Sequence, residues 1–181
     1  MANIFKIVDR IWNVYIHPEK RVEYARKLGV RIGDNCQILC DPVNAFGTEP
    51  WLITIGDHVD ITTDVQFLTH EGGIWVARGL NPLYEKYDKF APIKIGNNVM
   101  IGFRSIIMPG VTVGDNVIIA ANSIVTKDIP SNSIVGGMPA KQISNIDKFM
   151  ENMKIGIIPT KHMTPKEKKE WILQNCPELL R

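Results

Sequence analysis

One pattern of six residues, repeated six times without a break from Ile95 to Pro130, constrains the fold of this chain more than any other feature. Each repeat begins with an aliphatic residue, and these residues are Ile95, Ile101, Ile107, Val113, Ile119 and Val125. An α-helix would place apolar residues about every 3.6 positions, and an amphipathic strand about every second position. A strict period of six fits neither and is typical of a solenoid.

The period also predicts the shape of the solenoid. If three short strands form one triangular coil of about 18 residues, every sixth side chain points inward and the coils stack about 4.8 Å apart. The sequences GNN at 96–98 and GDN at 114–116 suit the corners, where a positive φ or a tight approach is needed. We therefore predict a mainly β chain with an aliphatic core.

Breaks in the repeat divide the chain into parts. Gly29 is a suitable end for a helix, and Thr164 is a suitable N-cap for a helix over 165–175. Flanking helices are expected to cover the open edges of the stack, which would otherwise invite aggregation. The predicted parts are an N-terminal helical cap at 1–29, a solenoid at 30–143 with an irregular stretch at 41–50 and an extruded loop at 71–92, and C-terminal helices at 144–181, the first of them at about 144–153.

The loop at 71–92 is longer than the connections usual in a compact domain, and such loops are usually functional or disordered. It carries the aromatic residues Trp75, Tyr84, Tyr87 and Phe90. Disordered segments are poor in aromatic residues, so we predict an ordered loop with a function.

Composition narrows the classes of partner. The 181 residues are 45% hydrophobic and 22% charged, and their net charge of +2 offers no strong field for nucleic acid. No apolar run approaches the about 20 residues that span a bilayer, and the N-terminal sequence lacks a cleavage site of small residues. We therefore expect no membrane span and a cytoplasmic location. Cys36 and Cys40 lack the spacing of a metal site and are predicted to be small buried thiols.

Four motifs carry a resemblance to a known family: FLTHEGG at 67–73, IKIGNNVMIG at 93–102, IVTKDIP at 124–130 and GGMPAK at 136–141. With them, residues 30–143 resemble the hexapeptide-repeat acyltransferases, in particular the galactoside, maltose and polysaccharide O-acetyltransferases. The resemblance implies a left-handed parallel β-helix with N-terminal and C-terminal capping helices. It also implies a homotrimer with active sites between subunits, and direct transfer of acetyl from acetyl-CoA to a hydroxyl of a sugar or saccharide, with no metal required.

The reaction of this family needs a base for the hydroxyl proton. A neutral imidazole, with an ordinary pKa of about 6.5, is available at neutral pH. A lone histidine is ordinarily structural, but His70 stands where the repeat opens into the long loop, within the family motif, and is the predicted catalytic base. Glu71 and Glu49 are both candidates to orient its imidazole, and the sequence does not choose between them.

By resemblance, the pantetheine arm of the cofactor lies in a groove beside the regular coils. The residues predicted to bind it are Gly102, Ala120, Ala121, Thr126 and Lys127, with Lys141 for a phosphate. The small residues also suit coil corners, and both roles can hold together. Phe103 departs from the family, many of whose members have a small polar residue there.

The acceptor site is expected between the stretch 41–50 and the loop after His70. Asp41, Asn44 and Glu49 are candidates to hydrogen-bond sugar hydroxyls, and Trp75 and Tyr84 are candidates to stack on a sugar face. The alternative is that the aromatic residues pack between subunits and the polar residues hold turns.

Other proteins use the same scaffold. Zinc carbonic anhydrases with a β-helix need three histidines gathered across a subunit boundary, but His58 and His70 are twelve residues apart and fall on different faces of a coil. A non-catalytic oligomerisation module is a second alternative. The nearer alternatives are an N-acetyltransferase of an amino sugar nucleotide and a xenobiotic acetyltransferase, which would use the same base and cofactor.

Overall fold

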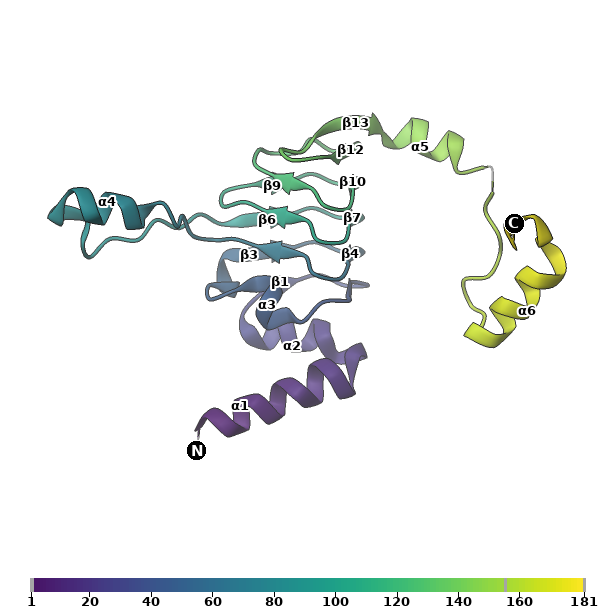
Figure 1. Cartoon of the computed structure of the whole chain (residues 1–181), viewed down its shortest axis with the longest axis horizontal. Helices are drawn as coiled ribbons and strands as arrows, with labels where there is room; N and C mark the ends of the chain where they lie inside the picture. The colour runs from purple at the N-terminus through teal and green to yellow at the C-terminus, as the bar shows by residue number, and fades with distance from the viewer. Residues whose placement is uncertain (1, 155, 181) are drawn as a thin grey trace. The chain divides into compact units, whose positions relative to one another are not determined.

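Three sheets make up the repeat region, and the chain contributes strands to them in rotation (Figure 1). The computed structural model describes residues 2–154 and 156–180. The first sheet contains β1 (Arg31–Ile32), β3 (Ile53–Ile55), β6 (Ile93–Ile95) and β9 (Thr112–Val113). The second contains β2 (Gln37–Ile38), β4 (Val59–Ile61), β7 (Val99–Ile101), β10 (Val117–Ile119), β12 (Ser133–Gly136) and β13 (Lys141–Asn145). The third contains β5 (Gln66–Phe67), β8 (Ile106–Ile107) and β11 (Ile124–Val125).

Strand pairing is parallel throughout the three sheets, apart from β13, which pairs antiparallel with β12. Equivalent repeat positions face one another, as Ile101 does Ile119 and Ile107 does Val125. The rotation of three short strands per coil, predicted from the period of six, is confirmed.

The aliphatic series forms the core of the stack. All six residues, Ile95, Ile101, Ile107, Val113, Ile119 and Val125, are at most 3% exposed. Ser105 and Ser123 also point inward, and their hydroxyls donate to the carbonyl of Ala120 at 3.0 and 2.6 Å. Because these donors are satisfied, small polar residues are tolerated inside the prism.

The corner between the first and second sheets is built as the GNN and GDN sequences predicted. Asn98 and Asn116 both have a φ of 55°, and the amide of Asn98 donates to Asn116 at 2.8 Å. A Cβ on Gly96 would lie 2.7 Å from the carbonyl carbon of Gly114, so the coils stack too closely there for a side chain. His58 occupies an equivalent position, with a φ of 55° and its Nδ1 at 2.8 Å from Asn98 Oδ1.

Helices precede the first coil. They are α1 (Ala2–Arg10), the π-helix η1 (Ile11–Ile16), the 3-10 helix η2 (Pro18–Lys20) and α2 (Arg21–Leu28). Gly29 ends α2 with a φ of 114°, which confirms its predicted role. Ala25 of α2 and Val30 join the core cluster, so α2 covers the first coil.

The stretch at 41–50 is more regular than predicted. It contains α3 (Pro42–Phe46) and the start of the 3-10 helix η3 (Pro50–Leu52). The side chain of Asp41 caps α3 by accepting a hydrogen bond from the backbone N–H of Val43 at 3.0 Å. Phe46 stacks on Phe67 inside the coil, with 5.1 Å between ring centroids. The break in the six-residue period therefore marks a helix that fills one side of a coil.

Asp41 also holds the N-terminal helices to the stack. Its Oδ2 accepts from Arg10 at 2.6 Å and from the Tyr15 hydroxyl at 2.8 Å. Burial alone would raise the pKa of Asp41, but these hydrogen bonds and the one from Val43 outweigh it and hold the pKa below its usual value. The folded chain therefore favours the ionised carboxylate.

Acid stability should depend on this carboxylate. Ionised Asp41 stabilises the fold above the ordinary aspartate pKa of about 3.9, and this stabilisation is lost as the pH falls below that value. We expect Asp41→Asn to be less stable at neutral pH and to lose less of its melting temperature than the wild type between about pH 5 and pH 3. Asp34→Asn, at a side chain that is 89% exposed, is the control. If the melting temperatures of Asp41→Asn and the wild type fell by the same amount between about pH 5 and pH 3, this role of Asp41 would be contradicted.

The loop at 71–92 contains α4 (Ile74–Leu80) and the 3-10 helix η4 (Pro82–Tyr84). The loop joins β5 to β6, and Figure 1 shows α4 projecting sideways from the stack. Side chains of the loop are largely exposed, including Trp75, Leu80, Leu83 and Tyr87. The loop is ordered by its own helices, and the repeat resumes at Ile93 as predicted.

The C-terminal part contains α5 (Ile146–Asn152), α6 (Pro165–Asn175) and the 3-10 helix η5 (Pro177–Leu180). The first of these begins later than predicted, because β13 continues to Asn145. Thr164 caps α6 and forms a capping box with Glu167, which confirms the predicted N-cap. The chain divides into two compact units between Lys148 and Phe149.

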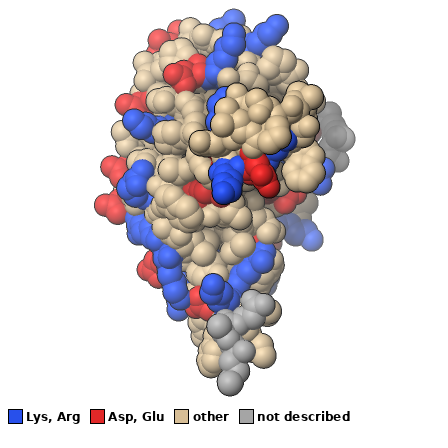
Figure 2. All heavy atoms as spheres, turned by 90° about the vertical axis from the view of Figure 1, so that its left-hand side faces the viewer, with Lys and Arg blue, Asp and Glu red and all other residues tan. Residues whose placement is uncertain are grey.

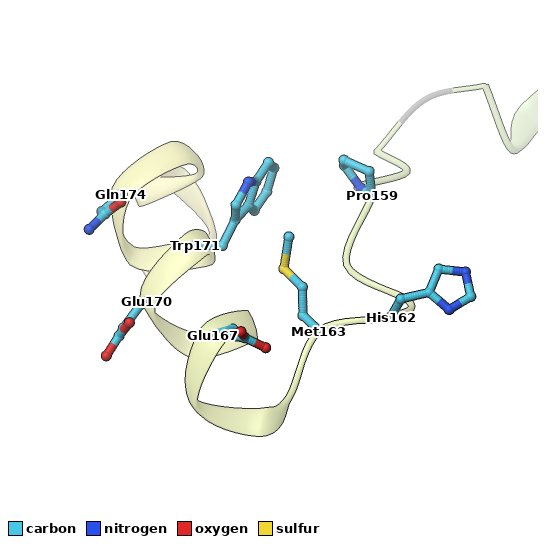
Figure 3. Close-up of a pocket in the computed structure, with 7 residues that line it drawn as sticks. All are labelled: Pro159, His162, Met163, Glu167, Glu170, Trp171 and Gln174. Atoms are coloured by element: carbon cyan, nitrogen blue, oxygen red, sulfur yellow. The ribbon is translucent and has the colours of Figure 1, made fainter.

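A hollow of about 510 Å³ lies in the C-terminal unit, beside Trp171, Met163 and Pro159 (Figure 3). The predicted site residues lie elsewhere. Among the residues that the structure describes, no helix is long and apolar enough to cross a membrane.

The three cysteines are free thiols. Cys40 is buried as predicted, and burial raises the pKa of its thiol to about 11. Cys36 is only half-buried, and burial likewise raises the pKa of its thiol.

Candidate active site

His70 stands where the chain leaves the third sheet. It follows β5 by three residues and forms an antiparallel bridge with Phe90. Backbone hydrogen bonds from Glu71 to Lys89 and from Ala91 to Thr69, both 2.9 Å long, close the neck of the loop on either side. Paired backbone on both sides therefore fixes the position of His70 at the mouth of the loop.

A carboxylate orients the imidazole of His70. Glu49 Oε2 lies 3.0 Å from His70 Nδ1 and also accepts from the Thr69 hydroxyl at 2.8 Å. The Thr48 hydroxyl donates to the other carboxylate oxygen at 2.6 Å. The side chain of Glu49 is 15% exposed, and that of His70 is 52% exposed. The two threonine hydroxyls therefore fix the carboxylate of Glu49, and the imidazole ring of His70 stays accessible to solvent.

Electrostatics favour one protonation pattern. Burial alone would raise the pKa of Glu49, but hydrogen bonds from Thr48, His70 and Thr69 outweigh it and keep the pKa below its usual value. An ionised carboxylate can only accept, so the Nδ1 of a neutral His70 carries the proton and its Nε2 has a free lone pair. A ring in this state can accept a proton at Nε2.

Glu71, the other candidate left open by the sequence, lines the same surface hollow as His70, but its carboxylate hydrogen-bonds within the loop. Its carboxylate accepts from the backbone N–H of Gly73 at 3.0 Å, within the loop. The structure thus brings Glu49, which is 21 residues distant in the sequence, to His70.

A hollow of about 370 Å³ opens beside this pair. Its lining includes Glu49, His70, Trp75, Arg78 and Phe90. Arg78 is held by the carboxylate of Asp88 and by the carbonyl of Tyr87 at 2.6 Å. The hollow therefore combines an imidazole, a fixed guanidinium and an indole ring.

The predicted acceptor residues separate into two groups. Glu49 and Trp75 line the hollow of His70, whereas Tyr84 lies in η4 and does not line it. Asp41 and Asn44 line another hollow of about 360 Å³, and both accept hydrogen bonds from Arg10. Within one chain, these two residues hold the N-terminal helices.

The predicted cofactor residues also lie along different edges of the prism. Thr126 and Lys127 directly follow β11. Strand register stacks Val125 on Ile107 and Ile107 on Phe67, so these two residues lie along the same edge of the prism as His70. Gly102, Ala120 and Ala121 lie on the edge that follows the second sheet. Thr126 and Lys127 are exposed.

Close stacking explains the glycine at 102. A Cβ there would lie 2.5 Å from the backbone nitrogen of Ala121. The next residue, Phe103, is partly exposed beneath the guanidinium of Arg104, which lies 4.8 Å from the ring centroid. Lys141, exposed at the start of β13, is paired in register with Gly136.

The two histidines considered for zinc lie apart. His58 occupies the corner after the first sheet, and His70 follows the third. Among residues 2–154 and 156–180, no group of three or more His, Cys, Asp or Glu could hold a metal ion.

Comparison with known proteins agrees with this architecture. A family model described as the hexapeptide repeat of succinyl-transferase matches residues 92–127. Protein CapG of Staphylococcus aureus is 47% identical over 153 residues, which cover 84% of this chain and 87% of that protein. The galactoside O-acetyltransferase of Escherichia coli K12 is 34% identical over 151 residues, with 72% of each chain covered.

A solved structure of an acetyltransferase is similar in three dimensions. It is a hexapeptide-repeat containing acetyltransferase from Vibrio cholerae O1 biovar eltor, complexed with acetyl coenzyme A. The two chains are 27% identical, with a TM-score of 0.56, over 75% of this chain and 81% of that one.

Proposed function

This chain belongs to the hexapeptide-repeat acetyltransferase family, and from that premise we propose that it transfers acetyl from acetyl-CoA to a hydroxyl of a sugar or saccharide, with His70 as general base. The observation that carries the proposal is the pairing of His70 Nδ1 with the ionised Glu49 at the mouth of the loop. A relative named for acetylation of galactosides and a neighbour with acetyl coenzyme A bound support the acceptor and the donor.

The proposed reaction is a single direct transfer. Nε2 of His70 accepts the proton of the acceptor hydroxyl while the hydroxyl oxygen attacks the carbonyl carbon of the thioester. The carbon–sulfur bond then breaks, and the CoA sulfur leaves as a thiolate that receives the proton from the imidazolium. Glu49 stabilises the imidazolium between the two proton transfers.

Several finer features of the fold and assembly belong to the same proposal. We infer a left-handed parallel β-helix with capping regions at 1–29 and 144–181, and a homotrimer in the cytoplasm. Trp75, which is 77% exposed, and the neighbouring apolar side chains of the loop support association between copies, because such side chains are usually covered. The cofactor roles of Gly102, Ala120, Ala121, Thr126, Lys127 and Lys141 remain predictions.

A panel of acceptors tests the reaction. Release of free thiol from acetyl-CoA should rise with hexoses or oligosaccharides and much less with amino sugars or xenobiotic amines. Faster release with amino sugar nucleotides would favour N-acetylation. No release with any acceptor, together with no binding of CoA by calorimetry, would leave only an oligomerisation module.

The role of Glu49 can be tested separately. In Glu49→Gln, turnover should fall by about tenfold or more with little change in KM, because the imidazolium loses its charged partner. Glu85→Gln is the matched control, since Glu85 is an exposed carboxylate of the same loop and does not line the hollow of His70. Equal effects of the two substitutions on turnover would contradict this role.

A further inference from the structure

The first helical segment turns its apolar side outward. Across α1 and η1, eight apolar or aromatic side chains are between 45% and 76% exposed. They are Ile4, Phe5, Ile7, Val8, Ile11, Trp12, Tyr15 and Ile16. Along α1, at about 100° per residue, the apolar positions form one continuous broad face opposite Lys6, Asp9 and Arg10. The π-helix η1 follows directly and also exposes its apolar side chains.

The polar side, by contrast, attaches the segment to the stack. Arg10 donates to Asp41 at 2.6 Å, and Asp9 pairs with Lys27 of α2 at 2.7 Å. Val14 is the apolar anchor and is fully buried. A surface helix in a water-soluble protein normally buries its apolar face, so this arrangement is inverted.

We propose that α1 and η1 form an in-plane anchor whose apolar face lies on an anionic lipid bilayer. The 15 residues from 2 to 16 extend at most about 22 Å, a length suited to lying in the interface rather than crossing it. Figure 1 shows α1 across one end of the stack, beyond α2, so a flat surface can reach it without meeting the coils. Phe5, Trp12 and Tyr15 supply the aromatic contacts usual at membrane interfaces.

Charge favours an anionic surface over a second copy of the chain. Residues 1–29 contain six Lys or Arg and three Asp or Glu, a net charge of +3. Asp41 and Asp34 of the stack pair with Arg10 and Arg26 of this segment, so the segment together with these two partners carries a net charge of +1. Figure 2 shows Lys and Arg flanking the lower end of the molecule on both sides. Two copies joined through this end would bring like charges together, while anionic headgroups would attract them.

Vesicle binding by the full-length protein tests the proposal without acetyl-CoA or an acceptor. We expect binding to vesicles of equal parts phosphatidylcholine and phosphatidylglycerol, weaker binding to phosphatidylcholine alone, and a further decrease at high salt. Trp12→Glu and Phe5→Glu should each lower the partition coefficient by about tenfold or more, because each places a charge in the apolar face. Met150→Glu, at an exposed residue of α5, is the matched control and should bind as the wild type does.

Three results would overturn the anchor. The first is absence of wild-type binding to the mixed vesicles, and the second is equal binding by both Glu variants. The third is a wild-type assembly, measured by light scattering without lipid, that both Glu variants dissociate, since this would place the face between copies. Acetyl transfer to a water-soluble acceptor should be unchanged in the variants, so a failure of the proposed activity is distinguishable from a failure of the anchor.

Discussion

His70→Ala should lower turnover by about 10² to 10⁴-fold, the usual contribution of a positioned general base. The loss follows from the site, because His70 supplies the only imidazole among the residues lining its hollow. In this variant Glu49 would stay ionised, but its carboxylate could not reach the point that Nε2 of His70 occupies in the wild type. Turnover should be measured by thiol release at saturating acetyl-CoA, with the acceptor that the panel identifies.

The control for this substitution is His162→Ala. His162 is an exposed histidine of the C-terminal unit, beside the hollow of Trp171. Its replacement should leave turnover unchanged, and both variants should melt within a few degrees of the wild type, since the side chain of His70 is half exposed. Turnover of His70→Ala close to that of the wild type would remove His70 from the reaction.

Phe67→Ala should have the largest effect on stability, a loss of about 3–5 kcal/mol in the free energy of unfolding. The side chain of Phe67 is 2% exposed and packs against Phe46 inside the coil. Its truncation leaves a cavity, and the paired strands on either side prevent the coil from collapsing to fill it. Chemical denaturation followed by circular dichroism measures the difference. Phe67 also lies in β5, three residues before His70, so activity should fall with the loss of structure.

Phe5→Ala is the matched control for size and chemistry. Phe5 is 76% exposed on α1, and without lipid its truncation should change the free energy of unfolding by no more than about 0.5 kcal/mol. Similar losses for Phe5→Ala and Phe67→Ala would mean that the apolar face of α1 is part of a buried core or subunit interface. That result would also argue against the membrane anchor.

Much of the scaffold was predictable because its interactions repeat at a short period. Each coil places an aliphatic residue inward and an Asn, Asp or Gly at the corner, so Ile101 and Asn98 need only neighbours of their own kind in the next coil. The stretch at 41–50 was mispredicted for the converse reason. A period shows where the pattern stops, but Asp41 and Pro42 begin a helix through local capping that a six-residue pattern does not register.

The sequence by itself determined a six-residue solenoid, its aliphatic core, the place where the loop leaves it, and His70 at that opening. Only the tertiary structure decided that Glu49, rather than Glu71, hydrogen-bonds to His70. It also decided that Arg10 forms an ion pair with Asp41 and that α1 exposes its apolar face. The physical reason is the distance along the chain: these contacts join residues 21 and 31 positions apart. These contacts depend on how a coil packs beside a helix. That packing cannot be predicted from the pattern of side chains along one strand.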